Sequence, residues 1–166
     1  MKHHPCPLHG GWKQRFTTAA DASFSSNSSR GDAKVFNVVN GVKGTITNVI
    51  EFLPDNEGKP SALEQLRVRI RATALSSTRV GLQFASIKAR FTKFLFLPLF
   101  GRRLTLTFLV PAPTLTRILF FFRKQKAIPK AFFEVLYLDD NLRIHRTGEG
   151  NIFIQERPGE GSASWL

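Results

Sequence analysis

Residues 66–74 alternate apolar and polar side chains without a break. The apolar positions are Leu66, Val68, Ile70, Ala72 and Ala74, and the polar positions between them are Arg67, Arg69, Arg71 and Thr73. Because the side chains of a β-strand point to opposite faces in turn, this period of two predicts an antiparallel strand with one buried and one solvated face. The three arginines have two open interpretations: a phosphate-binding stripe, or the ordinary wet side of a sheet.

Further strands are predicted along most of the chain. They cover residues 12–18, 35–39, 42–53, 79–91, 104–110, 132–138, 142–145 and 152–154. The Asn40-Gly41 pair is a strong hairpin signal, and a slip in the apolar phase between Phe84 and Ile87 predicts a bulge near Ala85. About eight strands joined by short turns predict an all-β fold, a closed antiparallel β-barrel that can hold one small ligand.

Residues 115–126 are the ambiguous segment. Ile118, Phe121 and Phe122 fall at helical spacing, and basic residues follow them, which is typical of a short amphipathic helix with a basic end. A buried strand explains the same run, because so short an apolar stretch cannot be assigned by its period. The fold prediction is therefore mainly β, with one short helix as an option here.

The length predicts a single domain over residues 12–157, after an irregular lead-in (1–11) and before a polar tail (158–166). Cys6 is the only cysteine, so no intramolecular disulfide can form. Histidines near Cys6 lack zinc-site spacing, and we expect no metal and no cofactor. No apolar run is long enough for a helix that spans a bilayer.

The formal net charge of +12 favours anionic partners such as an acidic membrane or nucleic acid. A Phe-rich segment inside a basic frame adds an apolar contact surface. The predicted lipid or membrane contact consists of Phe94, Phe96, Leu97, Leu99, Phe100, Arg102 and Arg103. Core filler or a barrel lid explains the same segment equally well.

The C-terminal stretch resembles the signature of the plastid lipid-associated protein family, also called fibrillins or plastoglobulins. The matching residues are Tyr137, Leu138, Asp139, Asp140, Leu142, Arg143, Ile144, Arg146, Gly150, Asn151, Ile152 and Phe153. In it, residues 139–141 predict a turn, since Asp and Asn bond their own backbone. A second match, Gly10-Gly11-Trp12 followed by Phe16-Thr17-Thr18, is similar to the opening strand of the family.

The Gly-X-Trp opening and a late arginine are also similar to the lipocalin arrangement, in which a tryptophan packs beneath an arginine at the closed end. Here the pair is Trp12 with Arg143 or Arg146. Strand parity favours Arg146, because it shares a face with the apolar Leu142 and Ile144, and it places His145 outward. An indole face attracts a cation by about 0.5–2 kcal/mol, so the predicted role of the pair is structural.

The resemblance implies a non-catalytic, lipid-binding or lipid-surface protein of plastids, at plastoglobules or thylakoids, that binds or shuttles small hydrophobic molecules. The N-terminus shows no transit-peptide pattern, although the resemblance implies import. The alternative is a basic barrel that binds single-stranded nucleic acid through residues 67–71. Catalysis is not expected, because Asp139, Asp140 and His145 form no recognisable catalytic motif.

Overall fold

The computed structural model describes residues 6–24, 32–55, 57–94, 97–98, 103–109 and 131–159. Within this part the chain is nearly all antiparallel strand, with one short 3-10 turn, η1 (Ala20–Ala22). The all-β prediction is therefore confirmed. The ambiguous residues 115–126 lie outside the described residues.

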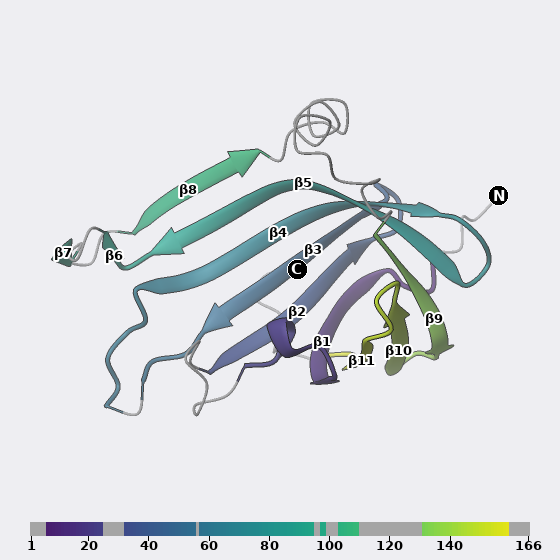
Figure 1. Ribbon diagram of the computed structural model, residues 1–166, viewed down its shortest axis with the longest axis horizontal. Helices are drawn as coiled ribbons and strands as arrows, with labels where there is room; N and C mark the ends of the chain where they lie inside the picture. Colours follow the sequence, from purple (N-terminus) through teal and green to yellow (C-terminus); the bar gives the residue numbers. More distant parts are fainter. Residues whose placement is uncertain are drawn as a thin grey trace, which may run out of the picture.

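Eleven strands are present in the described residues (Figure 1). They are β1 (Gly10–Thr17), β2 (Ala33–Asn40), β3 (Thr45–Phe52), β4 (Leu63–Ala74), β5 (Arg79–Phe91), β6 (Lys93–Phe94), β7 (Leu97–Pro98), β8 (Leu104–Leu109), β9 (Phe132–Leu138), β10 (Leu142–Thr147) and β11 (Ile152–Glu156). Eight of them follow one another as β4-β3-β2-β1-β11-β10-β9-β5, and β5 pairs back onto β4. The hydrogen-bonded strands therefore close into a ring, as the sequence predicted.

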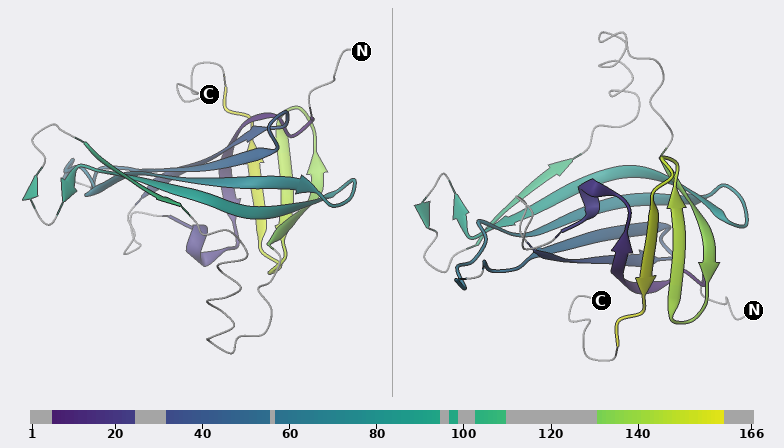
Figure 2. Two further views of the ribbon diagram at one scale, coloured as in Figure 1. Left: turned by 90° about the horizontal axis from the view of Figure 1, so that it is seen from above. Right: turned by 60° about the horizontal axis from the view of Figure 1, so that its bottom comes forward.

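One edge of strand β5 pairs with β4, and its other edge is shared by two different strands. Its first residues, Arg79–Gly81, pair with β9, whereas Ser86–Phe91 pair with β8. Figure 2 shows the consequence: the blue and teal strands β3 to β5 run well past the yellow-green strands β9 to β11. We call this extension of β3, β4, β5 and β8 the projecting sheet.

Local sequence signals explain the turns and the bend of the long strands. The Asn40-Gly41 hairpin is present, and the Asn40 side chain accepts a hydrogen bond from the backbone N–H of Lys43 at 2.9 Å. In the β4–β5 ladder Arg69 pairs with Ser86 and Ile70 pairs with Phe84, so Ala85 is the extra residue. The predicted bulge is thus confirmed, and it keeps apolar residues on the inner face on both sides of the slip.

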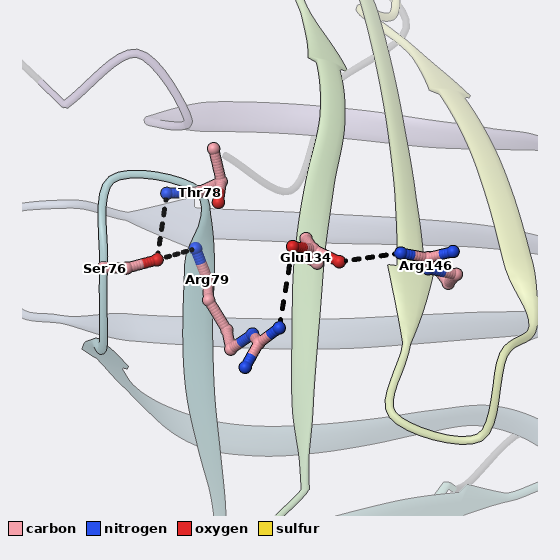
Figure 3. A network of polar contacts seen from close by, with 5 residues as sticks. All are labelled: Ser76, Thr78, Arg79, Glu134 and Arg146. Carbon is pink, nitrogen blue, oxygen red and sulfur yellow. Dashed lines mark hydrogen bonds and ion pairs between the residues drawn. The ribbon is translucent and has the colours of Figure 1, made fainter.

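The seam between β5 and β9 is short, and polar contacts reinforce it (Figure 3). Glu134 on β9 forms an ion pair with Arg79 at 3.6 Å and accepts a hydrogen bond from Arg146 at 2.9 Å. These cations lower the pKa of Glu134. At the neighbouring turn, the Ser76 hydroxyl accepts hydrogen bonds from the backbone N–H groups of Thr78 and Arg79.

Candidate functional site

One end of the ring is filled by a tryptophan and an arginine. Trp12 is fully buried, and its indole N–H donates to the Leu8 carbonyl at 2.9 Å. The Arg143 guanidinium, 1% exposed, lies 5.1 Å from the Trp12 ring and 5.9 Å from the Phe133 ring. A second arginine, Arg157, lies 3.9 Å from the Trp12 ring. The expected contact between an arginine and the Trp12 ring is therefore present, and cation–π attraction acts on both Arg143 and Arg157.

Amide side chains complete the surroundings of Arg143. Asn37 accepts hydrogen bonds from Arg143 at 2.7 Å and from Gln155 at 2.8 Å, and Gln155 also accepts one from Arg143. Asn37 in turn donates to Asn48 at 2.9 Å. Burial, with the charge of Arg157 nearby, lowers the pKa of Arg143 to about 9. Neutral amides and ring faces therefore stabilise this cation in place of a carboxylate.

His145 is enclosed beside this group. It is 6% exposed, stacks on Phe153 at 5.1 Å with the planes 4° apart, and lies 4.8 Å from Phe133. Burial, together with the positive charge of Arg143, lowers the pKa of His145 to about 3. The imidazole is therefore neutral at neutral pH. We call Trp12, Asn37, Arg143, His145 and Gln155 the Trp12 cluster.

The sequence prediction chose the wrong face of β10. Arg143 and His145 point inward, whereas Arg146 is exposed and pairs with Glu134 (Figure 3). The pairing of Trp12 with Arg146 and the outward placement of His145 are therefore wrong. The prediction assumed that apolar residues mark the inner face of every strand, but on β10 the inner residues are Arg143 and His145, which contact amide side chains and aromatic rings.

Because Arg143 and His145 face inward, the apolar residue between them, Ile144, faces outward. It belongs to a row of apolar side chains on the outside of the ring. The register aligns Phe16 with Ile154, Ile154 with Ile144, and Ile144 with Tyr137 across four strands. Phe16 is 54% exposed and Tyr137 is 48% exposed. We call these four residues the outer apolar row.

Asp139, one of the residues of the C-terminal signature, organises the turn before β10. One carboxylate oxygen accepts the backbone N–H groups of Asn141 at 2.7 Å and Leu142 at 2.6 Å, and the other accepts the Tyr137 hydroxyl at 2.7 Å. These donors lower the pKa of Asp139. The predicted turn is thus confirmed, and Asp139 acts as its cap.

The predicted Phe-rich contact is described only in part, and strands β6 and β7, which carry two of its residues, lie at the tip of the projecting sheet (Figure 1). Phe94 on β6 pairs with Leu97 on β7. Arg103 is exposed and forms an ion pair with Glu64 at 3.0 Å. The other residues of that prediction, Phe96, Leu99, Phe100 and Arg102, lie outside the described residues.

Two phenylalanines on the inner face of the projecting sheet were not assigned to a site by the sequence. Phe84 pairs with the core residue Ile70, and Phe108 pairs with Ile87, which itself pairs with Val68. Both therefore face the same side as the core. Phe84 is nevertheless 49% exposed and Phe108 55% exposed. The alternation of β4 and β5 predicts that Phe84 faces inward, but only the structure shows that Phe84 and Phe108 are about half exposed there.

The geometry defines the class of the protein as a ring-closed antiparallel β protein with a Trp–Arg pair inside one end. Residues 3–156 match the PAP_fibrillin family model, and the chain belongs to that family. It is thus a member of the plastid-associated family that its C-terminal signature resembles. No curated protein and no solved structure was found to match the chain.

No helix in the described part of the chain has the length and apolar character needed to cross a membrane. No group of three or more His, Cys, Asp or Glu side chains in the described ranges is placed to hold a metal ion.

Proposed function

We propose that this protein is a non-catalytic lipid-binding protein of plastids that binds or shuttles a small hydrophobic molecule at a plastoglobule or thylakoid surface. Membership in the plastid lipid-associated family supports the class of ligand and the compartment. The observation that carries the proposal is the half-exposed pair Phe84 and Phe108 on the inner face of the projecting sheet.

An apolar ligand gives this pair the contacts that the described chain does not. Phenylalanine offers a large apolar surface and no hydrogen-bonding group, so water is a poor neighbour for it. Removing apolar area from water stabilises a complex by about 25 cal/mol per Å². Lipid-binding pockets are mostly apolar and concave, which fits the inner side of a curved sheet.

The Phe-rich segment and the outer apolar row are additional contacts for a lipid surface under the same proposal. Phe94 and Leu97 lie on β6 and β7 at the tip of the projecting sheet, and the outer apolar row lies on β1, β11, β10 and β9, on the outside of the ring. A test must therefore separate an inner ligand from an outer surface contact.

Binding of Nile red, a neutral fluorescent apolar probe, in high salt is the direct test, because salt screens the charge of this basic protein. The wild type is compared with a Phe84→Ser/Phe108→Ser variant and with a Phe16→Ser/Tyr137→Ser control. Both variants remove two half-exposed aromatic rings. We expect the inner variant to bind about tenfold more weakly and the outer control to bind like the wild type.

Equal loss in both variants would contradict an inner ligand site, since the probe would then bind any exposed ring. Loss in the outer control alone would move the contact to the outer apolar row. If the wild type does not bind the probe at all, the lipid-binding proposal itself fails.

A further inference from the structure

The outer side of the sheet carries a basic groove across β2, β3, β4 and β5. It has a volume of about 330 Å³, and its cationic lining residues are Lys43, Arg67, Arg69 and Lys88. The register explains its shape. One row across the four strands consists of Val38, Thr47, Arg69 and Ser86. Its three short side chains form the floor of the groove, and Arg69 and the other long basic side chains form its walls.

None of the described residues that line the groove is acidic. Within the described part of the chain, five ion pairs form elsewhere, and none of them involves these four cations. Arg67 is held by a hydrogen bond from its Nε to the Gln65 side chain at 2.7 Å, which leaves its terminal nitrogens for another acceptor. Four neighbouring cations without a carboxylate repel one another, and an anion between them relieves that repulsion.

The chemistry of the lining fits oxygen atoms of a phosphate or a similar anionic group. Arginine presents a planar fork of N–H donors that matches such oxygens in pairs, and lysine adds a point charge. The hydroxyls of Thr45, Thr47 and Ser86 on the floor supply further donors. The volume suits one headgroup-sized anion more than an extended chain.

Two observations favour a lipid headgroup over nucleic acid. The described lining residues include no aromatic side chain, whereas proteins that bind single-stranded nucleic acid stack bases on aromatic side chains. Val42, next to Lys43 in the β2–β3 hairpin, is 89% exposed. A fully exposed aliphatic residue beside a basic groove suits an interface where apolar chains lie below charged headgroups.

We propose that this groove binds the headgroup of an acidic lipid and so docks the protein on anionic membrane surfaces. The inference rests on the proposed lipid function and deepens it, because it names the surface on which a hydrophobic molecule is exchanged. The sequence left two interpretations of the β4 arginines open, a phosphate-binding stripe and a merely solvated face. The proposal assigns Arg67 and Arg69 to the first of these.

Vesicle flotation tests the groove with a charge-matched control. The groove variant is Arg67→Gln/Arg69→Gln/Lys88→Gln, and the control is Lys34→Gln/Lys59→Gln/Arg146→Gln, three cations outside the groove lining. Each variant loses three positive charges. The vesicles are neutral galactolipid, with or without phosphatidylglycerol, in about 0.1 M salt. We expect the groove variant to bind the acidic vesicles about a hundredfold more weakly than wild type, and the control to lose much less.

Equal loss in both variants would overturn the proposal and leave only attraction by net charge. Unchanged binding by the groove variant would overturn it as well. A single-stranded oligonucleotide that binds more tightly than the acidic vesicles, and does so only with an intact groove, would assign the groove to nucleic acid instead. Displacement by millimolar inorganic phosphate alone would reduce it to a free-anion site.

Nile red binding by the groove variant keeps this test separate from the proposed function. If that variant still binds the probe in high salt, it is folded and its inner site works, so a failure on acidic vesicles concerns the groove. If neither the wild type nor the variant binds the probe, the lipid function fails independently of the groove.

Discussion

Two sets of cations in this protein lack a carboxylate neighbour, and they differ in access to water. Arg143 in the Trp12 cluster is enclosed by ring faces and amide oxygens. Arg69 and Lys88 in the basic groove are open to solvent. The enclosed cation is part of the core, whereas an open group of cations attracts an anion.

The energetic consequences differ in the same way. Burying a charge costs several kcal/mol unless polar groups compensate for it. Asn37 and Gln155 supply part of that compensation through one terminal nitrogen of Arg143, whereas its Nε and its other terminal nitrogen have no hydrogen-bond partner among the described residues. The groove cations stay hydrated, so they cost the fold little. Substitutions in the Trp12 cluster should therefore change stability, and substitutions in the groove should change binding.

The largest effect is expected for Trp12→Ala. This side chain is fully buried at the centre of the core and carries the cation–π contacts of Arg143 and Arg157. Deleting a buried aromatic residue costs about 3–5 kcal/mol, so the urea midpoint should fall sharply. Phe16→Ala, at a half-exposed ring on the neighbouring part of β1, should cost far less. Similar losses for both would contradict the assignment of Trp12 to the core.

Arg143→Ala should come next, with Arg146→Ala as its matched partner three residues further along the same strand. Removing Arg143 leaves a cavity and takes a donor from Asn37 and Gln155, which predicts a loss of about 3 kcal/mol in unfolding free energy. Arg146 is exposed, and its ion pair with Glu134 should contribute little. Urea denaturation of both variants measures the difference. A larger loss for Arg146 would restore the parity argument made from the sequence.

His145 predicts a smaller, pH-dependent effect. Its folded pKa of about 3 lies below the ordinary value of 6.5, so the unfolded chain binds the proton first as the pH falls. Stability should therefore decrease from about pH 6.5 downward, by about 2 kcal/mol at pH 5 relative to pH 7.5. In His145→Phe this part of the pH dependence should disappear from the denaturation midpoints. An unchanged pH profile would contradict the enclosure of the imidazole.

The smallest effect on stability is expected in the groove. Arg69→Gln changes an exposed side chain, so the free energy of unfolding should stay within about 0.5 kcal/mol of wild type. The same variant should weaken flotation with acidic vesicles and flatten its salt dependence. A clear drop in the melting temperature would mean that Arg69 supports the fold. It would contradict the distinction between Arg143, which acts on stability, and Arg69, which acts on binding.

The sequence predicted the features that depend on local chemistry. The alternation of residues 66–74, the Asn40 hairpin, the bulge at Ala85 and the Asp139 turn all appear as predicted. Each follows from backbone preferences or side-chain periodicity within one or two strands. The class of fold followed from their number and spacing.

The facing of β10 could not be predicted in the same way. Its apolar residues lie outward because its inner neighbours include Trp12 and Asn37, which come from strands near the start of the chain, with Asn37 106 residues before Arg143. Asn37 and Gln155 are 118 residues apart, and no local pattern links them. A buried arginine also looks like a surface residue in any hydrophobicity pattern.

The sharing of one edge of β5 between β8 and β9 has a consequence for how the chain folds. Strands β1 to β5 each pair with their successor, and so do β9 to β11, which makes two meanders of local hairpins. Among the described residues, β1–β11 and β5–β9 are the strand pairings that join them, and the second spans just three residue pairs in the ladder. Local hairpins form fast, whereas contacts between distant segments carry the entropy of loop closure. The rate of folding should therefore be set by the docking of the two meanders, and the short seam at Arg79–Gly81 should be where the native ring opens first under amide hydrogen exchange.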